Sequence, residues 1–267
     1  FNHHAFRDRV RLSGVNSINW ARVAIQVVYY FTAAVALGAP HRKIAFTVPT
    51  GNFGDVYAGY VASRMGLPID RLVVATNVND ILVRTFATGT YEIRDVIATT
   101  SPSMDIQVSS NFERLLFDAY GRDAQAVRAL MASLAQHRRF ALSASAIKEL
   151  RSLFTADRAD EQESAAEIRA WVREADYCVD PHTAVALAVA EKEKRDPSVP
   201  MVVLSTAHPA KFPDAVKAAC GVTPALPDTL ADLGRRNERI VVLPADQTAV
   251  ERYVTSVSRA AREGAAA

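Results

Sequence analysis

A glycine-bearing segment, Thr50-Gly51-Asn52-Phe53-Gly54-Asp55, has the residue types and spacing best suited to chemistry in this chain. It follows a short β-rich run at residues 43–48 and precedes a helical pattern at 56–65. Backbone N–H groups at the start of a helix lack an internal partner and favour a bound anion. Glycine lets the backbone approach that anion closely. The segment therefore predicts either a phosphate-binding loop or a tight turn.

Two nucleotide-binding motifs are excluded at this loop. A P-loop needs Lys and Ser or Thr directly after the second glycine, where this chain has Asp55 and Val56. A dinucleotide fingerprint needs G-x-G-x-x-G, and only G-x-x-G is present. An ionised Asp55 would repel a bound phosphate unless its side chain pointed away. We therefore expect Asp55 to cap the helix or to hold the loop in place.

The elements that must position this loop alternate between strands and helices. Apolar patterns and breakers predict helices at 15–37, 56–65, 80–87, 213–219 and 248–259, and strands at 43–48, 72–76, 200–204 and 240–243. This alternation is typical of a doubly wound α/β fold with a parallel sheet. The first helix is apolar nearly all round, which predicts burial on both flanks. Residues 122–180 contain no Gly or Pro, which predicts several helices joined by polar turns.

Composition narrows the classes of protein and partner. The 267 residues are 49% hydrophobic and 22% charged, an ordinary balance for a globular chain. A net charge of +2 is too small to indicate a nucleic acid or an anionic membrane as partner. Cys178 and Cys220 have neither C-x-x-C nor metal-ligand spacing. We therefore expect no metal site and a reducing, cytoplasmic compartment.

Six strings recur in the order of one known family through nearly the whole chain. They are Val15-Asn16-Ser17-Ile18-Asn19-Trp20-Ala21-Arg22, the loop at 49–55, Ala75-Thr76-Asn77-Val78-Asn79-Asp80-Ile81-Leu82, Ser101-Pro102-Ser103-Met104-Asp105-Ile106, Asp180-Pro181-His182-Thr183-Ala184 and Thr206-Ala207-His208-Pro209-Ala210-Lys211-Phe212. These strings resemble the threonine synthases of the bacterial and fungal type. The resemblance implies an α/β pyridoxal-phosphate enzyme of fold type II. It further implies that residues 1–267 are an incomplete, C-terminal portion of the catalytic unit, with a mainly helical insertion at about 101–180.

The resemblance also implies an activity and assigns residues to it. The family converts O-phospho-L-homoserine and water to L-threonine and phosphate, the last step of threonine biosynthesis, as a carbon–oxygen lyase acting on phosphate. Gly51, Asn52, Phe53, Gly54 and Asp55 would hold the phosphate of pyridoxal 5′-phosphate. Thr206 would face the pyridine nitrogen, where a hydroxyl would not force that nitrogen to stay protonated and so would moderate the electron sink.

One departure from the family concerns the lysine that forms the Schiff base with the cofactor. The family carries it in its N-terminal portion, and no matching segment exists in this sequence. Of the six lysines, Lys211 alone lies in a family string, at a position that does not form the Schiff base. We therefore expect no catalytic residue in this chain and a missing N-terminal segment of the same enzyme as its partner. We also expect no turnover by the chain alone.

Several polar residues keep two interpretations. Asn16, Ser17, Asn19 and Arg22 could contact the substrate phosphate, since an arginine fork matches phosphate oxygens. Alternatively, Asn16 or Ser17 could cap the first helix while Arg22 pairs with a buried acid.

Alternative interpretations also remain for two histidines and for the function of the chain. His182 is expected to hold a turn by a hydrogen bond, rather than to catalyse. His208 could act near the cofactor or stabilise its loop. The alternative functions are another fold-type-II pyridoxal-phosphate lyase and a non-catalytic phosphate-binding α/β module.

Overall fold

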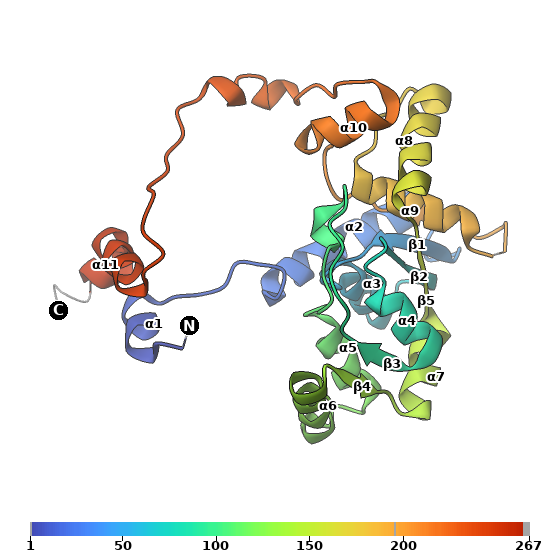
Figure 1. The fold of residues 1–267 in the computed structure, drawn as a ribbon. Helices are drawn as coiled ribbons and strands as arrows, with labels where there is room; N and C mark the ends of the chain where they lie inside the picture. The colour runs from blue at the N-terminus through green and yellow to red at the C-terminus, as the bar shows by residue number, and fades with distance from the viewer. Residues whose placement is uncertain (1, 195, 264–267) are drawn as a thin grey trace. The chain divides into compact units, whose positions relative to one another are not determined.

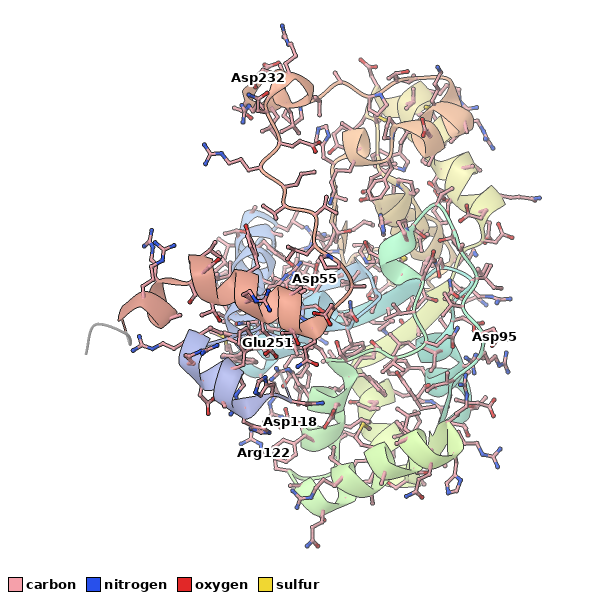
Figure 2. The ribbon with its side chains drawn as sticks, turned by 60° about the vertical axis from the view of Figure 1, so that its left-hand side comes forward. Asp55, Asp95, Asp118, Arg122, Asp232 and Glu251 are labelled. Atoms are coloured by element: carbon pink, nitrogen blue, oxygen red, sulfur yellow. The ribbon has the colours of Figure 1, made fainter. Side chains whose placement is uncertain are left out.

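The computed structural model describes residues 2–194 and 196–263, which divide into two compact units. The terminal unit joins residues 1–16 to 226–267, and the central unit comprises residues 17–225. The terminal unit contains α1 (His4–Val10), η3 (Asp228–Leu230), η4 (Leu233–Arg235), α11 (Gln247–Val257) and α12 (Arg259–Glu263). Within it, His3 Nδ1 lies 2.8 Å from Glu251 Oε1, and Glu251 is labelled in Figure 2. The strand predicted at 240–243 is wrong, because that segment has no regular structure.

The central unit is built on a four-stranded parallel sheet (Figure 1). Its strand order is β5-β2-β1-β6, with β1 at Ile44–Pro49, β2 at Ile69–Thr76, β5 at Phe154–Arg158 and β6 at Met201–Val203. All three strand pairs are parallel, so the carboxyl ends of the strands lie along one edge. Every residue of β1 is buried, as expected for a strand covered on both faces.

Helices cover both faces of this sheet. Leu72 and Val74 of β2 share a core with α2 (Trp20–Ala36), α3 (Gly54–Arg64), α4 (Ile81–Thr88) and α7 (Ala144–Leu153). Val73 and Ala75 face the opposite side and pack against α9 (Pro181–Lys192). This alternation follows from the two-residue period of a strand. The predicted doubly wound α/β fold is confirmed.

The remaining elements of the central unit flank this sandwich. α8 (Glu161–Ala175) packs on α9, and α10 (Pro213–Cys220) packs on α8. A two-stranded antiparallel pair joins β3 (Thr90–Glu92) to β4 (Arg139–Ala141). The other elements are η1 (Pro102–Met104), α5 (Phe112–Ala119), α6 (Ala124–His137) and η2 (Pro209–Lys211).

The region predicted as a helical insertion at about 101–180 is mainly helical, but it also contains strands. α5, α6, α7 and α8 lie there, together with β4 and β5. β5 pairs with β2 and forms one edge of the main sheet. The expectation that residues 122–180 hold only helices and turns is therefore wrong, because the absence of Gly and Pro permits strands as well as helices.

The first long helix differs from its prediction in its start and its burial. α2 begins at Trp20 because the side chain of Asn19 caps it, accepting a hydrogen bond from Ala21 N at 2.9 Å. One face is buried, but Ile25, Val28 and Val35 on another face are 60–72% exposed. The prediction that this helix is buried on both flanks is therefore wrong. No helix among the described residues is long and apolar enough to cross a membrane.

Candidate functional site

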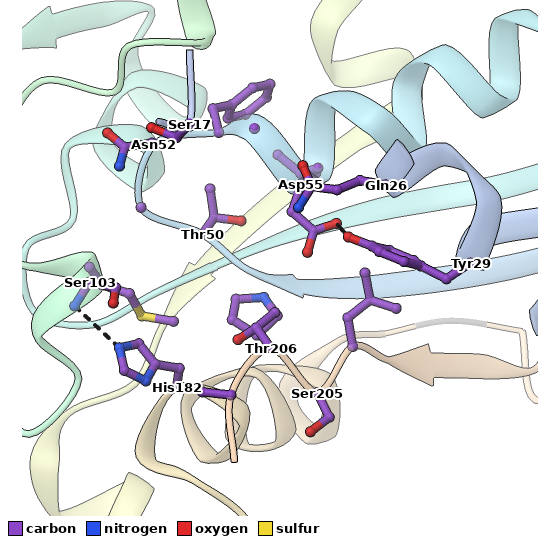
Figure 3. A pocket seen from close by; sticks show the side chains of 18 of the residues that line it. Ser17, Gln26, Tyr29, Thr50, Asn52, Asp55, Ser103, His182, Ser205 and Thr206 are labelled. Atoms are coloured by element: carbon purple, nitrogen blue, oxygen red, sulfur yellow. Dashed lines mark hydrogen bonds between the residues drawn. The ribbon is translucent and has the colours of Figure 1, made fainter. Parts of the chain in front are cut away.

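A cavity of about 850 Å³ lies at the carboxyl edge of the sheet, beyond the ends of β1 and β6 (Figure 3). This edge is where ligands bind in open α/β sheets. The loop after β1, the segment after β6, part of α2, the η1 turn and the start of α9 line it. All the lining residues belong to the central unit.

The loop between β1 and α3 presents its backbone amides as hydrogen-bond donors. Thr50 anchors the loop, donating from its N–H to Ala75 O at 2.7 Å and from its hydroxyl to Val48 O at 2.6 Å. Phe53 then takes a left-handed conformation (φ 62°) with its ring buried, and α3 starts at Gly54. The amides of residues 51–55 have no acceptor among the described residues. Such a row of amides at a helix start suits an anion.

Neighbouring segments hold this loop by its carbonyl groups. Ser109 Oγ donates to Gly51 O at 2.7 Å, and Asn111 donates to Asn52 O from its backbone N–H at 3.0 Å and from its side chain at 3.1 Å. A Cβ added to Gly51 would lie 2.3 Å from Ser103 O. Only glycine therefore fits where η1 approaches the loop.

Asp55 ties the first turn of α3 to α2. Tyr29 Oη donates to Asp55 Oδ1 at 2.5 Å (Figure 3). Tyr30 Oη donates to the same oxygen at 3.1 Å. Burial raises the pKa of Asp55 to about 6, although these two hydrogen bonds act to lower it. Burial, and then the charge of this carboxylate, raise the pKa values of both tyrosines. Of the two roles expected for Asp55, holding the loop is confirmed; the cap position belongs to Phe53.

The opposite wall is formed by the segment after β6. Ser205 and Thr206 are exposed and line the cavity. Lys211 also lines it, with Nζ 5.9 Å from the centroid of the Phe212 ring. His208 is exposed and is not among the lining residues, and its Nδ1 accepts from Ala210 N at 3.2 Å. Its contact in the structure is therefore the loop-stabilising one.

The start of α2 contributes two of the four predicted substrate-binding residues. Ser17 and Arg22 line the cavity, whereas Asn19 caps α2 and Asn16 falls in the terminal unit. Among the described residues Arg22 forms no ion pair with an acid. The expected cap at Asn16 or Ser17 is wrong, because Asn19 performs it.

Sequence reasoning missed Gln26, Tyr29 and Ser103 as lining residues. Arg22, Gln26 and Tyr29 are spaced i, i+4 and i+7, so they share one face of α2. This polar face within an apolar helix was a signal in the sequence. Ser103 lay in a family string but had no recognisable role.

His182 lines the cavity and is 4% exposed. Its Nε2 accepts from Ser103 N at 3.2 Å, and its Nδ1 lies 2.8 Å from Asp180 Oδ1. The expectation that His182 holds a turn by hydrogen bonding is confirmed.

The sequence of this chain matches those of known threonine synthases. The family model "Threonine synthase, C-terminal" matches residues 183–254. A curated threonine synthase of Pseudomonas aeruginosa is 48% identical over 256 residues, which cover 96% of this chain and 55% of that protein. The threonine synthase of Saccharomyces cerevisiae is 42% identical to this chain. The matched region covers 82% of this chain and 46% of the yeast protein. The chain spans about half the length of the curated relatives it matches.

Solved structures agree with this comparison. The crystal structure of PLP-bound threonine synthase from Brucella melitensis superposes with a TM-score of 0.93 at 59% identity, covering 97% of this chain and 56% of that one. The yeast threonine synthase structure gives a TM-score of 0.81 at 36% identity, covering 93% of this chain and 54% of that one.

Proposed function

Because the chain corresponds to the C-terminal portion of threonine synthases, we propose that it builds the cofactor-phosphate cradle and one wall of the active site in a pyridoxal-phosphate-dependent threonine synthase. The proposed reaction converts O-phospho-L-homoserine and water to L-threonine and phosphate, by elimination and replacement at carbon–oxygen bonds. The proposed partner is a segment equivalent to the N-terminal portion of the family. The proposed compartment is the cytoplasm, since both cysteines are free.

The observation that carries the proposal is the row of amides at residues 51–55 that have no acceptor among the described residues. Gly51, Asn52, Phe53, Gly54 and Asp55 thus provide donors where a phosphate monoester needs them, at the positive end of the α3 dipole. The cavity of about 850 Å³ falls in the range of small-molecule sites. The residues present therefore fit pyridoxal phosphate.

Thr206 is the proposed partner of the pyridine nitrogen, on the wall opposite the cradle. When bound, the cofactor supplies an electron sink for charge that develops next to the amino group. A hydroxyl offers a hydrogen bond without the fixed negative charge that would hold the ring nitrogen protonated. Thr206→Asp is therefore expected to change the partition between threonine and side products, and an unchanged partition would contradict this role.

Ser17, Arg22 and Gln26 are the proposed site for the substrate phosphate. They lie on α2 and just before it, and all three line the cavity together with the cradle. The guanidinium of Arg22 matches two phosphate oxygens at once, and the amide of Gln26 adds a donor. Of the six lysines, all of them described, Lys211 is the one that lines the cavity. We propose that the lysine that transfers protons comes from the N-terminal portion.

Ligand titration tests the cradle directly. By calorimetry, pyridoxal phosphate and inorganic phosphate should compete for one site on the chain, and pyridoxal should bind at least about tenfold more weakly, a difference of about 1.4 kcal/mol. Equal affinity for pyridoxal and its phosphate would refute a phosphate cradle.

Turnover tests the substrate. The chain alone should release no phosphate from O-phospho-L-homoserine. Mixed with the N-terminal portion of a threonine synthase, it should release phosphate from O-phospho-L-homoserine but not from O-phospho-L-serine. Equal release from both would favour a different fold-type-II lyase.

A further inference from the structure

A buried pair of residues, Asp180 and His182, lies at the start of α9 and has no role in the function proposed above. Asp180 caps this helix, accepting from His182 N at 2.9 Å. Its side chain also accepts from the hydroxyl of Thr183. The His182 ring packs 4.9 Å from the ring of Phe212. Asp180 is 1% and His182 4% exposed, so neither side chain exchanges partners with bulk water.

The hydrogen bonds of His182 fix its protonation. A backbone N–H can only donate, so Nε2 must accept from Ser103 N and carries no hydrogen (Figure 3). The ring hydrogen is then on Nδ1, which donates to Asp180 Oδ1 at 2.8 Å. Both ring nitrogens are occupied within the chain. His182 is therefore not available as an acid or base toward a molecule in the cavity.

Ser103 connects this histidine to the cradle. Its N–H is held by His182, while its carbonyl oxygen lies where a Cβ on Gly51 would approach within 2.3 Å. The η1 turn thus packs directly on the first residue of the loop. The loop is also held by Ser109 and Asn111, which donate to the carbonyls of Gly51 and Asn52. The cradle is thus held by two sets of contacts, from Ser103 and from Ser109 with Asn111.

We propose that His182 is a positioning residue for the phosphate cradle. Its hydrogen bond to Ser103 holds η1 against Gly51, and this contact keeps the amides of residues 51–55 directed at the anion. This inference rests on the proposed function, because it assigns a support to the same phosphate site. It concerns the chain's own residues, and its effect is measurable without turnover.

Two substitutions test the roles of the two ring nitrogens of His182 separately. His182→Asn retains a donor near the Nδ1 position for Asp180 but cannot reach Ser103. His182→Gln places an amide oxygen near the Nε2 position, where it can accept from Ser103 N. His208→Asn is the matched control, since His208 also accepts a backbone N–H near a helix start but does not line the cavity. The probes are inorganic phosphate and pyridoxal phosphate.

The expected result is a rescue pattern. His182→Asn should weaken phosphate binding about tenfold, as expected for loss of one buried hydrogen bond. Exchange of the Ser103 amide hydrogen should accelerate at least about tenfold in the same variant. His182→Gln should stay within about threefold of the unsubstituted chain in both measurements, and His208→Asn should match that chain.

Other outcomes overturn the inference. Equal phosphate affinity in the Asn variant and the unsubstituted chain would exclude a positioning role, as would equal losses in the Asn, Gln and His208 variants. If the Asn variant fails to fold, the nitrogen NMR spectrum of the unsubstituted chain decides, because a protonated Nε2 on His182 contradicts the proposed geometry. If the unsubstituted chain itself binds no phosphate, the proposed function fails instead.

Discussion

The two strand ends that meet at the cavity are held very differently. After β1, Thr50 and Phe53 are buried and the loop receives hydrogen bonds from Ser109 and Asn111. After β6, Ser205 and Thr206 are exposed, and the partner of Ser205 Oγ is the hydroxyl of Thr183 at 3.4 Å. The cradle is thus fixed before any anion arrives, whereas the opposite wall is loosely held.

This difference has an energetic meaning. Donors that are already oriented lose little conformational freedom when they bind an anion, so they convert more of their interaction energy into affinity. An exposed hydroxyl such as that of Thr206 forms its bond only when the ring is present. We therefore expect substitutions at the cradle to act on stability and anion binding, and substitutions at the opposite wall to act on ring recognition alone.

The largest effect on phosphate binding is expected for Gly51→Ala. The new Cβ would lie 2.3 Å from a backbone oxygen of Ser103, so η1 or the loop must move. Overpacking of this kind costs about 1–3 kcal/mol of stability, and displaced amides should weaken phosphate binding more than about tenfold. Gly234→Ala is the control, because nothing lies within 4 Å of its added Cβ. If calorimetry finds equal phosphate affinity in both variants, close packing of Ser103 on Gly51 does not hold the cradle.

The next effect concerns Asp55→Asn and pH. The pKa of Asp55 is raised from 3.8 to about 6 in the folded chain, so between these values the folded state holds the proton more tightly than the unfolded state. The free energy of unfolding should therefore fall as pH rises from about 4 to about 6, by on the order of 3 kcal/mol from this group.

The Asn variant should lack this slope while still accepting from both tyrosines. It should also bind phosphate several-fold more tightly above pH 7, because one negative charge near the cradle is gone. Urea unfolding at a series of pH values measures the difference between the two chains. The pKa of Glu167 is also raised, by burial and by the neighbouring Glu191, but this contribution is the same in both chains and cancels. Parallel pH profiles would show that Asp55 does not titrate as inferred.

Ser109→Ala tests one support of the cradle and should have an intermediate effect. It removes the hydroxyl that donates to Gly51 O at 2.7 Å, and Ser109 is 4% exposed. Leaving the partly buried Gly51 O without this partner should cost about 1–3 kcal/mol. Ser152→Ala provides a comparison, since Ser152 Oγ donates to Glu149 O on an exposed helix surface. A loss of stability no larger than in this comparison would indicate that the loop is held without Ser109.

The smallest effect on stability is expected for Thr206→Val. The side chain is exposed, so the free energy of unfolding should change by less than about 0.5 kcal/mol. Affinity for pyridoxal phosphate should fall by a few-fold because the ring loses a hydrogen bond, while affinity for inorganic phosphate should not change. A parallel loss for both ligands would place Thr206 on the phosphate side of the cavity and remove the contrast between the two walls.

Much of the fold followed from local patterns. The buried strands and the helices after them were predictable because apolar periodicity and glycine punctuation are local properties. β5 was missed because its residues, Phe154–Arg158, lie between charged helices and form a strand through pairing with β2. The exposed face of α2 could not be inferred, because apolar composition does not say which neighbours cover a helix.

The sequence alone determined the loop chemistry: two glycines between a strand and a helix, Asp55 after them, and strings that resemble one family. Tertiary structure decided what those residues do. Asp55 faces two tyrosines, Ser103 packs on Gly51, and His182 accepts a hydrogen bond from Ser103 N, 79 residues away in the chain. The physical reason is that helix starts and turns are written in neighbouring residues, whereas buried hydrogen bonds and steric contacts arise between residues that only folding brings together.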